Sequence, residues 1–403
     1  MLKLAFRNIF RNRLRTSLTL AAIVSGVVAI IVSGGFVEDV FIQLREATIH
    51  SRIGHMQVYR EGYLEFSKRE PARYLIEDPK PAVRALQGVP GVAGVMTRLN
   101  FSGLANNGRA DLPIVGEGVE VDQEARFGGA TTIVAGRPLR DSDAYGVLVG
   151  EGVAAALHLK PGKYVTLVVN THDGALNTLE FEVVGVFRTF FKEYDDRAVR
   201  IPQAASQELM YTAAVDNLVV SLNETEATDA VLALVKAKLE PLGYEVKPWY
   251  ELAHFYEKSV ALYRRQFGAL QFIILVMLVL SVASTVNMAV YERTGEFGTM
   301  LALGQRRGTV FRLVLLEYGL LGLIGGFAGL VLGVLLALGI SSVGIPMPPP
   351  PGSNADYVAS VRVVPGVLLM ALAVGAVAAT LAAVLPGRRA ARLPVVDALR
   401  HNI

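Results

Sequence analysis

Four long apolar runs constrain the fold of this 403-residue chain more than any other feature. They cover residues 17–37, 267–290, 313–343 and 365–385, and each is at least 21 residues long. A helix needs about 20 apolar residues to cross the hydrocarbon core of a bilayer. Buried helices of soluble proteins are usually shorter and keep polar residues on one face. The sequence therefore predicts a membrane protein with four transmembrane helices.

Charge is distributed unevenly along the chain, although the formal net charge is only +3. Residues 1–16 hold five basic and no acidic side chains, residues 291–312 hold four and two, and residues 386–403 hold four and one. The segment 38–266 holds 25 basic and 31 acidic side chains. Short loops rich in Lys and Arg stay in the cytoplasm. Both termini and the 291–312 connection are therefore expected inside, with 38–266 and the short loop 344–364 outside.

The external segment 38–266 has ordinary globular composition and is predicted to form an α+β domain. Alternating apolar stretches flank polar turns at 106–108 and 171–177, which predicts two hairpins. Two helix-then-strand units, at 82–97 and 230–247, resemble each other. They indicate two equivalent halves with a β-rich insertion between them.

Amphipathic stretches precede the first two spans. In residues 1–16, apolar side chains recur at helical spacing beside basic ones, which predicts a helix lying in the headgroup region. A simple basic anchor is an equally good interpretation of that stretch. Residues 250–266 are polar and amphipathic and contain neither Gly nor Pro. We therefore expect the second transmembrane helix to continue outwards as a stalk.

No catalytic motif stands out. The chain has no cysteine, which excludes a thiol nucleophile, a disulfide scaffold and any cysteine-based metal site. A P-loop, a Gly-x-Ser-x-Gly elbow, an H-E-x-x-H motif and a calcium-binding loop are all missing from the sequence. We therefore expect no catalytic residue, no cofactor and no metal site in this chain. Basic residues do not interleave with aromatic ones, so no nucleic-acid partner is expected.

Several polar residues have plain interpretations. His50 and His55, and the pair Asp195-Asp196, are interpreted as solvated surface groups. Glu317 is the only acidic residue within a predicted span. It is interpreted as an interfacial residue near the cytoplasmic end of its helix rather than as a proton relay. Few charges inside the spans argue against a hydrophilic ion or sugar path.

Three glycines recur every four residues in the third span, at Gly325, Gly329 and Gly333. Small residues at this spacing allow two helices to approach closely in lipid. The pattern predicts a helix-packing face, against the alternative that glycine is simply common in membrane spans.

The connection between the second and third spans begins at Tyr291 and reads Y-E-R-T-G-E-F-G-T-M-L-A-L-G-Q-R-R. It resembles the E-R-x-x-E-[IF]-G-x-[LM]-x-A-[LI]-G signature of the ABC permease family that includes FtsX, the macrolide exporter MacB and the lipoprotein-releasing permeases LolC and LolE. The opening at 7–16 and the tail at 386–400 resemble those of the family, as does the order of the spans. The resemblance implies an α-helical membrane protein with four transmembrane helices and an extracytoplasmic α+β domain, a MacB-like periplasmic core.

The resemblance also implies partners. The chain would be a permease of the bacterial inner membrane without an ATP site of its own, paired with a separate ABC ATPase dimer that binds ATP and Mg²⁺. A second permease copy or a paralogue would complete the complex, which also contacts membrane lipid. The 292–304 motif would be a coupling helix seated on the ATPase, and the rival interpretation is a merely structural amphipathic turn. The residues implied in coupling are Glu292, Arg293, Glu296, Phe297, Gly298, Leu301, Gly304 and Arg306.

The spacing of the glutamates and the positions of the glycines in the motif predict local structure. Glu292 and Glu296 lie four residues apart, which fits one helical face, and Gly298 and Gly304 allow close approach or helix termination. Gly295 departs from the larger polar residue that the family often carries at this position.

The function implied first is lipoprotein release from the outer leaflet of the inner membrane by mechanotransmission. In that mechanism, ATP-driven closure moves the external domains and no substrate passes through the membrane. One alternative is efflux of peptides or drugs through a periplasmic adaptor. Another is a non-transporting signal transducer, similar to FtsX, that controls an envelope hydrolase. The sequence leaves the substrate, the homodimer or heterodimer state and the cargo-contacting residues open.

Overall fold

The computed structural model describes Phe6, residues 13–67, 69–127, 131–347 and 357–392, and Pro394. The amphipathic helix expected in residues 1–16 lies largely outside the described residues, as does the tail after Pro394. The chain divides into two compact units. The membrane unit comprises Met1–Ile42, Val260–Pro346 and Val358–Ile403, and the extramembrane domain comprises Gln43–Ser259 and Met347–Tyr357.

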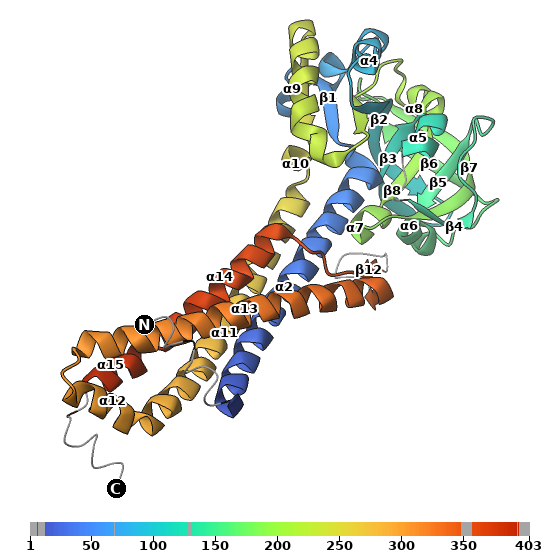
Figure 1. Ribbon diagram of the computed structural model, residues 1–403. Coiled ribbons are helices and arrows are strands. Elements are labelled where there is room, and N and C mark those ends of the chain that lie inside the picture. The colour runs from blue at the N-terminus through green and yellow to red at the C-terminus, as the bar shows by residue number, and fades with distance from the viewer. Residues whose placement is uncertain are drawn as a thin grey trace. The chain divides into compact units, whose positions relative to one another are not determined.

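Four helices of the described chain are long and apolar enough to cross a membrane (Figure 1). They are α2 (Arg13–Thr48), α11 (His254–Glu292), α13 (Arg307–Val343) and α14 (Pro365–Ala382). Helix α2 continues past Val37, and α11 begins well before Phe267. The stalk expected on the second span is therefore present as one continuous helix. Two short helices, α12 (Thr294–Ala302) and α15 (Val384–Arg392), accompany the long ones.

The membrane unit has a core of small and branched apolar side chains. Val27 of α2, Val286 of α11, Val310 of α13 and Ala378 of α14 are all almost completely buried in one cluster. Small and β-branched side chains allow the helices to approach closely, which compensates for the weak hydrophobic drive between helices in lipid.

The connection between α13 and α14 is tied to α2 through a buried carboxylate. Arg362 Nε donates to Asp39 Oδ1 at 2.8 Å, and Ser360 N donates to Asp39 Oδ2 at 3.0 Å. A Cβ added to Gly35 would lie 2.4 Å from the carbonyl oxygen of Arg362, so this approach requires glycine. Two short strands of the same connection, β11 (Ile345–Met347) and β12 (Tyr357–Ala359), pair with each other.

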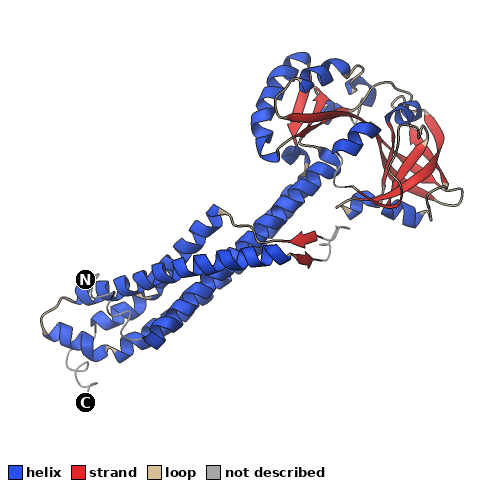
Figure 2. Cartoon of the chain, turned by 45° about the vertical axis from the view of Figure 1, so that its right-hand side comes forward, coloured by secondary structure: helices blue, strands red, loops and turns tan. Residues whose placement is uncertain are grey.

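The described strands of the extramembrane domain form one ten-stranded sheet, with helices packed around it (Figure 2). Its first half has the antiparallel order β10-β1-β9-β2. These strands and their two long helices are β1 (Met56–Arg60), α4 (Lys80–Gln87), β2 (Val92–Asn106), β9 (Asn217–Leu222), α9 (Thr228–Leu239) and β10 (Tyr244–Pro248). The units β1–α4–β2 and β9–α9–β10 share one apolar core, and they are the two equivalent helix-then-strand units expected from the sequence.

The second half is a closed barrel, because neighbouring strands pair in the ring β2-β3-β8-β5-β7-β6 and β6 pairs again with β2. Its further strands are β3 (Asp111–Val119), β5 (Gly146–Gly150), β6 (Tyr164–Asn170), β7 (Leu176–Arg188) and β8 (Ala198–Pro202), with β4 (Thr132–Gly136) added beside β7. Both predicted hairpins, β2/β3 and β6/β7, are confirmed. The barrel is the β-rich insertion expected between the two equivalent units.

Short helices lie in the connections between the strands of the domain, before β1 and after β10. They are η1 (Ile49–Ile53), α3 (Tyr63–Phe66), η2 (Pro71–Tyr74), α5 (Val121–Phe127), α6 (Glu151–Ala156), α7 (Lys192–Asp195), α8 (Gln203–Met210), η3 (Thr225–Ala227), η4 (Glu240–Leu242) and α10 (Trp249–Leu252). Strand β2 belongs to both halves, since Arg98 is in register with Asn217 of β9 on one side and Val119 of β3 on the other. Arg98 thus marks the junction between the two halves.

Candidate functional site

The E-R-x-x-E motif spans the end of one helix and the start of the next. Helix α11 ends at Glu292, Arg293 leaves the helical conformation with ψ of 14°, and α12 begins at Thr294. Glu292 and Glu296 therefore belong to different helices, and the expectation that they share one helical face is wrong. The helix is interrupted at Arg293 because the side chain of this residue turns towards α13.

Arg293 joins three elements through its guanidinium group. Its Nη1 donates to both carboxylate oxygens of Glu317 on α13 at 2.9 Å, and its Nε donates to Glu296 at 3.1 Å. Glu317 is only 6% exposed, so its carboxylate is buried within the membrane unit. A buried carboxylate needs such a partner, and Arg293 supplies it. The pair fixes the orientation of α12 against α13.

The predicted coupling residues divide into an inner and an outer set. Phe297 and Gly298 are buried against the bundle, and Arg293 and Leu301 are half-buried. The outer set is exposed and comprises Glu292, Glu296, Gly304 and Arg306. The inner set packs α12 against the bundle, and the outer set lies exposed on its surface. A role in ATPase contact stays a prediction for both sets.

The end of α12 exposes an apolar residue that the sequence reasoning did not select. Gly304 has a φ of +86° and its N–H donates to Leu301 O, which terminates the helix as glycine does at many helix ends. The preceding side chain, Leu303, is 81% exposed. In the sequence, the position of Leu303 just before the helix-terminating Gly304 was the signal that could have identified it.

Helix α15 lies beside α12 and gives this end of the unit its basic character. Pro386, Gly387 and Ala390 are buried against the bundle, while the arginines of the same helix are exposed. Arg389 Nη1 donates to Asn287 Oδ1 of α11 at 3.4 Å. The exposed faces of α12 and α15 thus lie at the same end of the membrane unit.

The three glycines of the third span face helix α2. An added Cβ would come within 2.9 Å of Ile23 at Gly325, within 2.8 Å of Val27 at Gly329 and within 2.8 Å of Ile31 at Gly333. Real Cβ atoms do not approach so closely, so this helix crossing depends on glycine at these positions.

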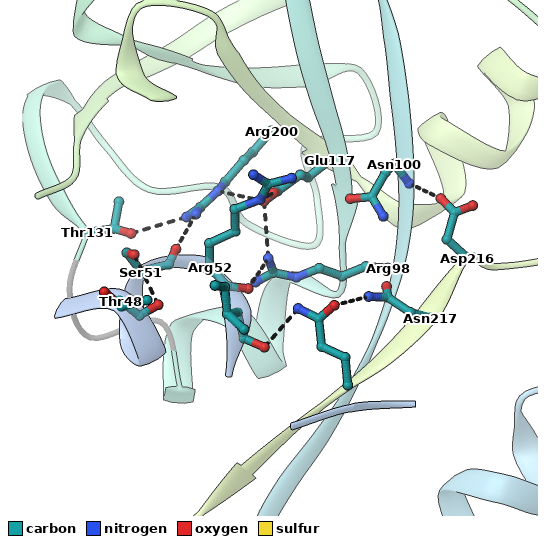
Figure 3. Close-up of polar contacts among 12 residues, drawn as sticks. Thr48, Ser51, Arg52, Arg98, Asn100, Glu117, Thr131, Arg200, Asp216 and Asn217 are labelled. Atoms are coloured by element: carbon teal, nitrogen blue, oxygen red, sulfur yellow. Dashed lines mark hydrogen bonds and ion pairs between the residues drawn. The ribbon is translucent and has the colours of Figure 1, made fainter. Parts of the chain in front are cut away.

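The extramembrane domain contains a buried charged network that sequence reasoning missed (Figure 3). We call it the arginine cluster, and its members are Arg52, Arg98, Glu117, Glu124 and Arg200. Glu117 on β3 and Arg200 on β8 are in register on neighbouring strands. Arg98 donates to Glu117 at 3.2 Å and to Glu124 at 2.8 Å, and Arg52 donates to Glu117 at 2.8 Å. Arg200 lies 3.1 Å from Glu124, and its guanidinium also covers the ring of Phe187.

Electrostatics in the cluster favour the charged state of Glu117. Burial alone would raise the pKa of this carboxyl group, but the guanidinium groups of Arg98, Arg200 and Arg52 outweigh it and lower the pKa to about 2. Burial raises the pKa of the neighbouring Tyr194 phenol to about 12. Glu117 is therefore ionised at neutral pH, while Tyr194 stays neutral.

Two residues expected on the surface are buried. His55 is 1% exposed, its Nδ1 accepts from Leu222 N at 3.2 Å, and burial lowers its pKa to about 4. Asp195 is fully buried, and its carboxylate accepts from the N–H and hydroxyl of Thr189. Both side chains accept from buried backbone N–H groups, which compensates for the cost of burying them. No group of three or more His, Asp or Glu side chains within the described residues is placed to hold a metal ion.

Comparison with known proteins covers both parts of the chain. Residues 16–238 match the family model of the MacB-like periplasmic core domain, and residues 268–395 match that of the FtsX-like permease C-terminal region. The uncharacterized ABC transporter permease YvrN of Bacillus subtilis is 26% identical, with 100% of this chain and 99% of YvrN covered.

Two further relatives carry functional names. The lipoprotein-releasing system transmembrane protein LolE of Haemophilus influenzae is 25% identical, with 64% of each chain covered. The macrolide export ATP-binding/permease protein MacB of Rhodospirillum rubrum is 26% identical, with 99% of this chain and 60% of MacB covered.

Proposed function

Since the chain belongs to the family of ABC transporter permeases with a MacB-like periplasmic core and an FtsX-like permease region, we propose that it is the permease subunit of an ATP-driven export complex. It is a multi-pass protein of the inner (cell) membrane. ATP hydrolysis would take place on a separate ABC ATPase dimer, with a second permease copy or a paralogue completing the complex. The relative YvrN, of which the chain covers 99%, is named as an ABC transporter permease without an ATP-binding part, which supports a separate ATPase.

The orientation follows from charge. The basic segments at both termini and between the second and third spans would lie in the cytoplasm, since short basic loops stay inside. The exposed faces of α12 and α15 would then meet the ATPase. The extramembrane domain, which carries an excess of acidic side chains, would lie on the outer side.

The observation that carries the proposal is the ion pair between Arg293 and Glu317. The motif arginine holds α12 and simultaneously reaches into α13, so a force applied to the exposed face of α12 would be passed directly to a membrane helix. A guanidinium bound to both oxygens of a carboxylate resists rotation better than a single hydrogen bond does. This is what a coupling helix requires.

As to substrate, we propose release of a lipoprotein or a similar amphiphile from the outer leaflet by mechanotransmission. The membrane helices α2 and α11 are each continuous with segments assigned to the extramembrane domain, which supports mechanical transmission. Within the four apolar runs at 17–37, 267–290, 313–343 and 365–385, Glu317 is the only acidic residue, and it pairs with Arg293. That favours a substrate handled outside the bundle over a hydrophilic solute passing through it.

The test is co-purification of the tagged full-length protein in mild detergent, followed by mass spectrometry of everything retained. We expect a stoichiometric ABC ATPase and, in the lipoprotein case, a lipid-modified protein as cargo. A retained periplasmic adaptor would instead assign adaptor-dependent efflux, and a retained envelope hydrolase would assign signalling. Absence of any ATPase would overturn the proposed function.

A further inference from the structure

Helix α2 ends inside the extramembrane domain in an unusual way. Its last turn widens into the π-helix η1, which closes with Gly54 N donating to Ile49 O at 2.8 Å. Gly54 has a φ of +69° and an added Cβ would lie 2.4 Å from Val219, so the chain leaves the helix abruptly here. π-Helical turns are rare and are often found at functional positions.

The free carbonyl groups at this helix end are bound by the arginine cluster. Arg200 Nη2 donates to Ser51 O at 2.7 Å, and Arg98 Nη1 donates to Arg52 O at 2.9 Å (Figure 3). The last carbonyls of a helix lack partners within it and carry the negative end of the helix dipole. Two buried cations therefore satisfy this helix end through charge-assisted hydrogen bonds. The side chain of Glu117, between both arginines and Arg52, holds them in place.

The bound helix end touches both halves of the domain. Arg98 lies on β2 where the two halves meet, and Arg200 lies on β8 in the barrel. From the other half, Thr225 donates to Glu46 Oε2 at 3.1 Å, and Glu226 accepts from Arg45 at 2.8 Å. A movement of the helix end would thus reach the barrel and the α9 side at the same time.

We propose that Arg98 and Arg200 are positioning residues of the transport cycle, which hold the carbonyl end of α2 so that its movement is delivered to both halves of the extramembrane domain. This inference rests on the proposed function, because it assumes that ATP drives a movement of α2. Arginine suits the task because its planar group binds a helix carbonyl and a carboxylate at once in fixed directions. Lysine keeps the charge and loses that geometry.

The test compares hydrogen–deuterium exchange of the complete complex without nucleotide and trapped with ATP and vanadate. The variant is Arg200→Lys, which keeps the charge balance of the cluster. The matched control is Arg188→Lys, since Arg188 makes a two-pronged ion pair with Glu151 in the same barrel and does not bind the end of α2. In the wild type and in the control, trapping should alter the rate of hydrogen–deuterium exchange both in α12 and in strands β2 and β8. In Arg200→Lys the α12 change should persist, and the change in β2 and β8 should fall at least threefold.

The outcomes separate the two proposals. No change at α12 in the wild type would count against the proposed function. A change at α12 with no change in β2 and β8 of the wild type, or an unaltered response in Arg200→Lys, would overturn the role of the arginines. Exchange of β1 and β9 in the nucleotide-free variant checks that the fold is intact. If Arg200→Lys does not fold, Arg98→Lys is measured in its place with the same expectation.

Discussion

Two charged networks of this molecule differ in how their residues are brought together. The Arg293–Glu317 pair in the membrane unit draws on a contiguous motif and one residue of the next helix. The arginine cluster of the extramembrane domain draws on five segments spread from Arg52 to Arg200. The first is nearly local and the second exists only when the sheet is complete. The motif that contains Arg293 can be recognised in the sequence, whereas its pairing with Glu317 and every pair of the cluster depend on the fold.

The difference should appear most strongly on loss of Glu117. This carboxylate pairs with three guanidinium groups. Glu117→Ala should leave Arg98 and Arg200 with Glu124 as their remaining carboxylate partner and lower the free energy of unfolding by about 3–5 kcal/mol. Unfolding of the detergent-solubilised protein can be followed by the fluorescence of Trp249, which is the only tryptophan of the chain. Glu180→Ala on the exposed face of β7 is the control and should have little effect. Equal effects of the two substitutions would show that the cluster is solvated.

Loss of the local pair should affect coupling more than global stability. Arg293→Ala releases α12 from Glu317, and we expect at least a tenfold drop in retained ATPase because α12 loses its fixed orientation. The cost of an unpaired Glu317 should be about 3 kcal/mol, partly relieved by protonation of the carboxylate. ATPase retained on immobilised permease is the measurement. Arg307→Ala, which removes an exposed arginine at the start of α13, serves as control. Undiminished binding by Arg293→Ala would count heavily against α12 as a coupling helix.

Acid should destabilise the extramembrane domain through two buried groups, His55 and Glu117, in different pH ranges. Burial, with a smaller contribution from His50, lowers the pKa of His55 to about 4, whereas an unfolded chain protonates histidine near pH 6.5. The unfolded state then binds more protons, so the free energy of unfolding should fall by about 2 kcal/mol as the pH drops from about 6.5 towards 4. The contribution of Glu117 is present above its unfolded pKa of about 4.3 and is lost only as the pH falls further towards 2.

His55→Gln should flatten the slope between pH 6.5 and pH 4, since glutamine can still accept from Leu222 N. Urea unfolding at a series of pH values gives the slope. His158→Asn, at an exposed position with φ of 51°, is the matched control. A slope that is the same in both variants would assign the pH dependence to other groups.

Hydrophobic periodicity and motifs predicted much of the secondary structure of this molecule. They did not predict which polar residues are buried. The four spans, the stalk in α11 and both hairpins follow from apolar runs and turn residues, which act over short distances. The break at Arg293 and the burial of His55 and Asp195 do not, because each depends on partners that only tertiary structure supplies. A signal for the cluster was nevertheless present, since Arg98 and Arg200 are the only charged residues of β2 and β8, and Glu117 is the only charged residue of β3 after its first position. Complementary isolated charges in different strands predict buried pairing, although not which strands are neighbours.

The glycines of α13 are an intermediate case between the two networks. Their spacing is a local feature of the sequence, whereas their partners on α2 are distant in the sequence. Gly329→Ala should destabilise the membrane unit by about 1–2 kcal/mol, since its Cβ would lie 2.8 Å from Val27 and two backbones would have to separate. Gly339→Ala on the same helix has no atom within 4 Å of its added Cβ and should be neutral or slightly stabilising. Thermal unfolding of both variants in the same detergent measures the difference. A loss shared by both would mean that glycine serves helix flexibility in α13, whereas a loss confined to Gly329 would assign the spacing to contact with α2.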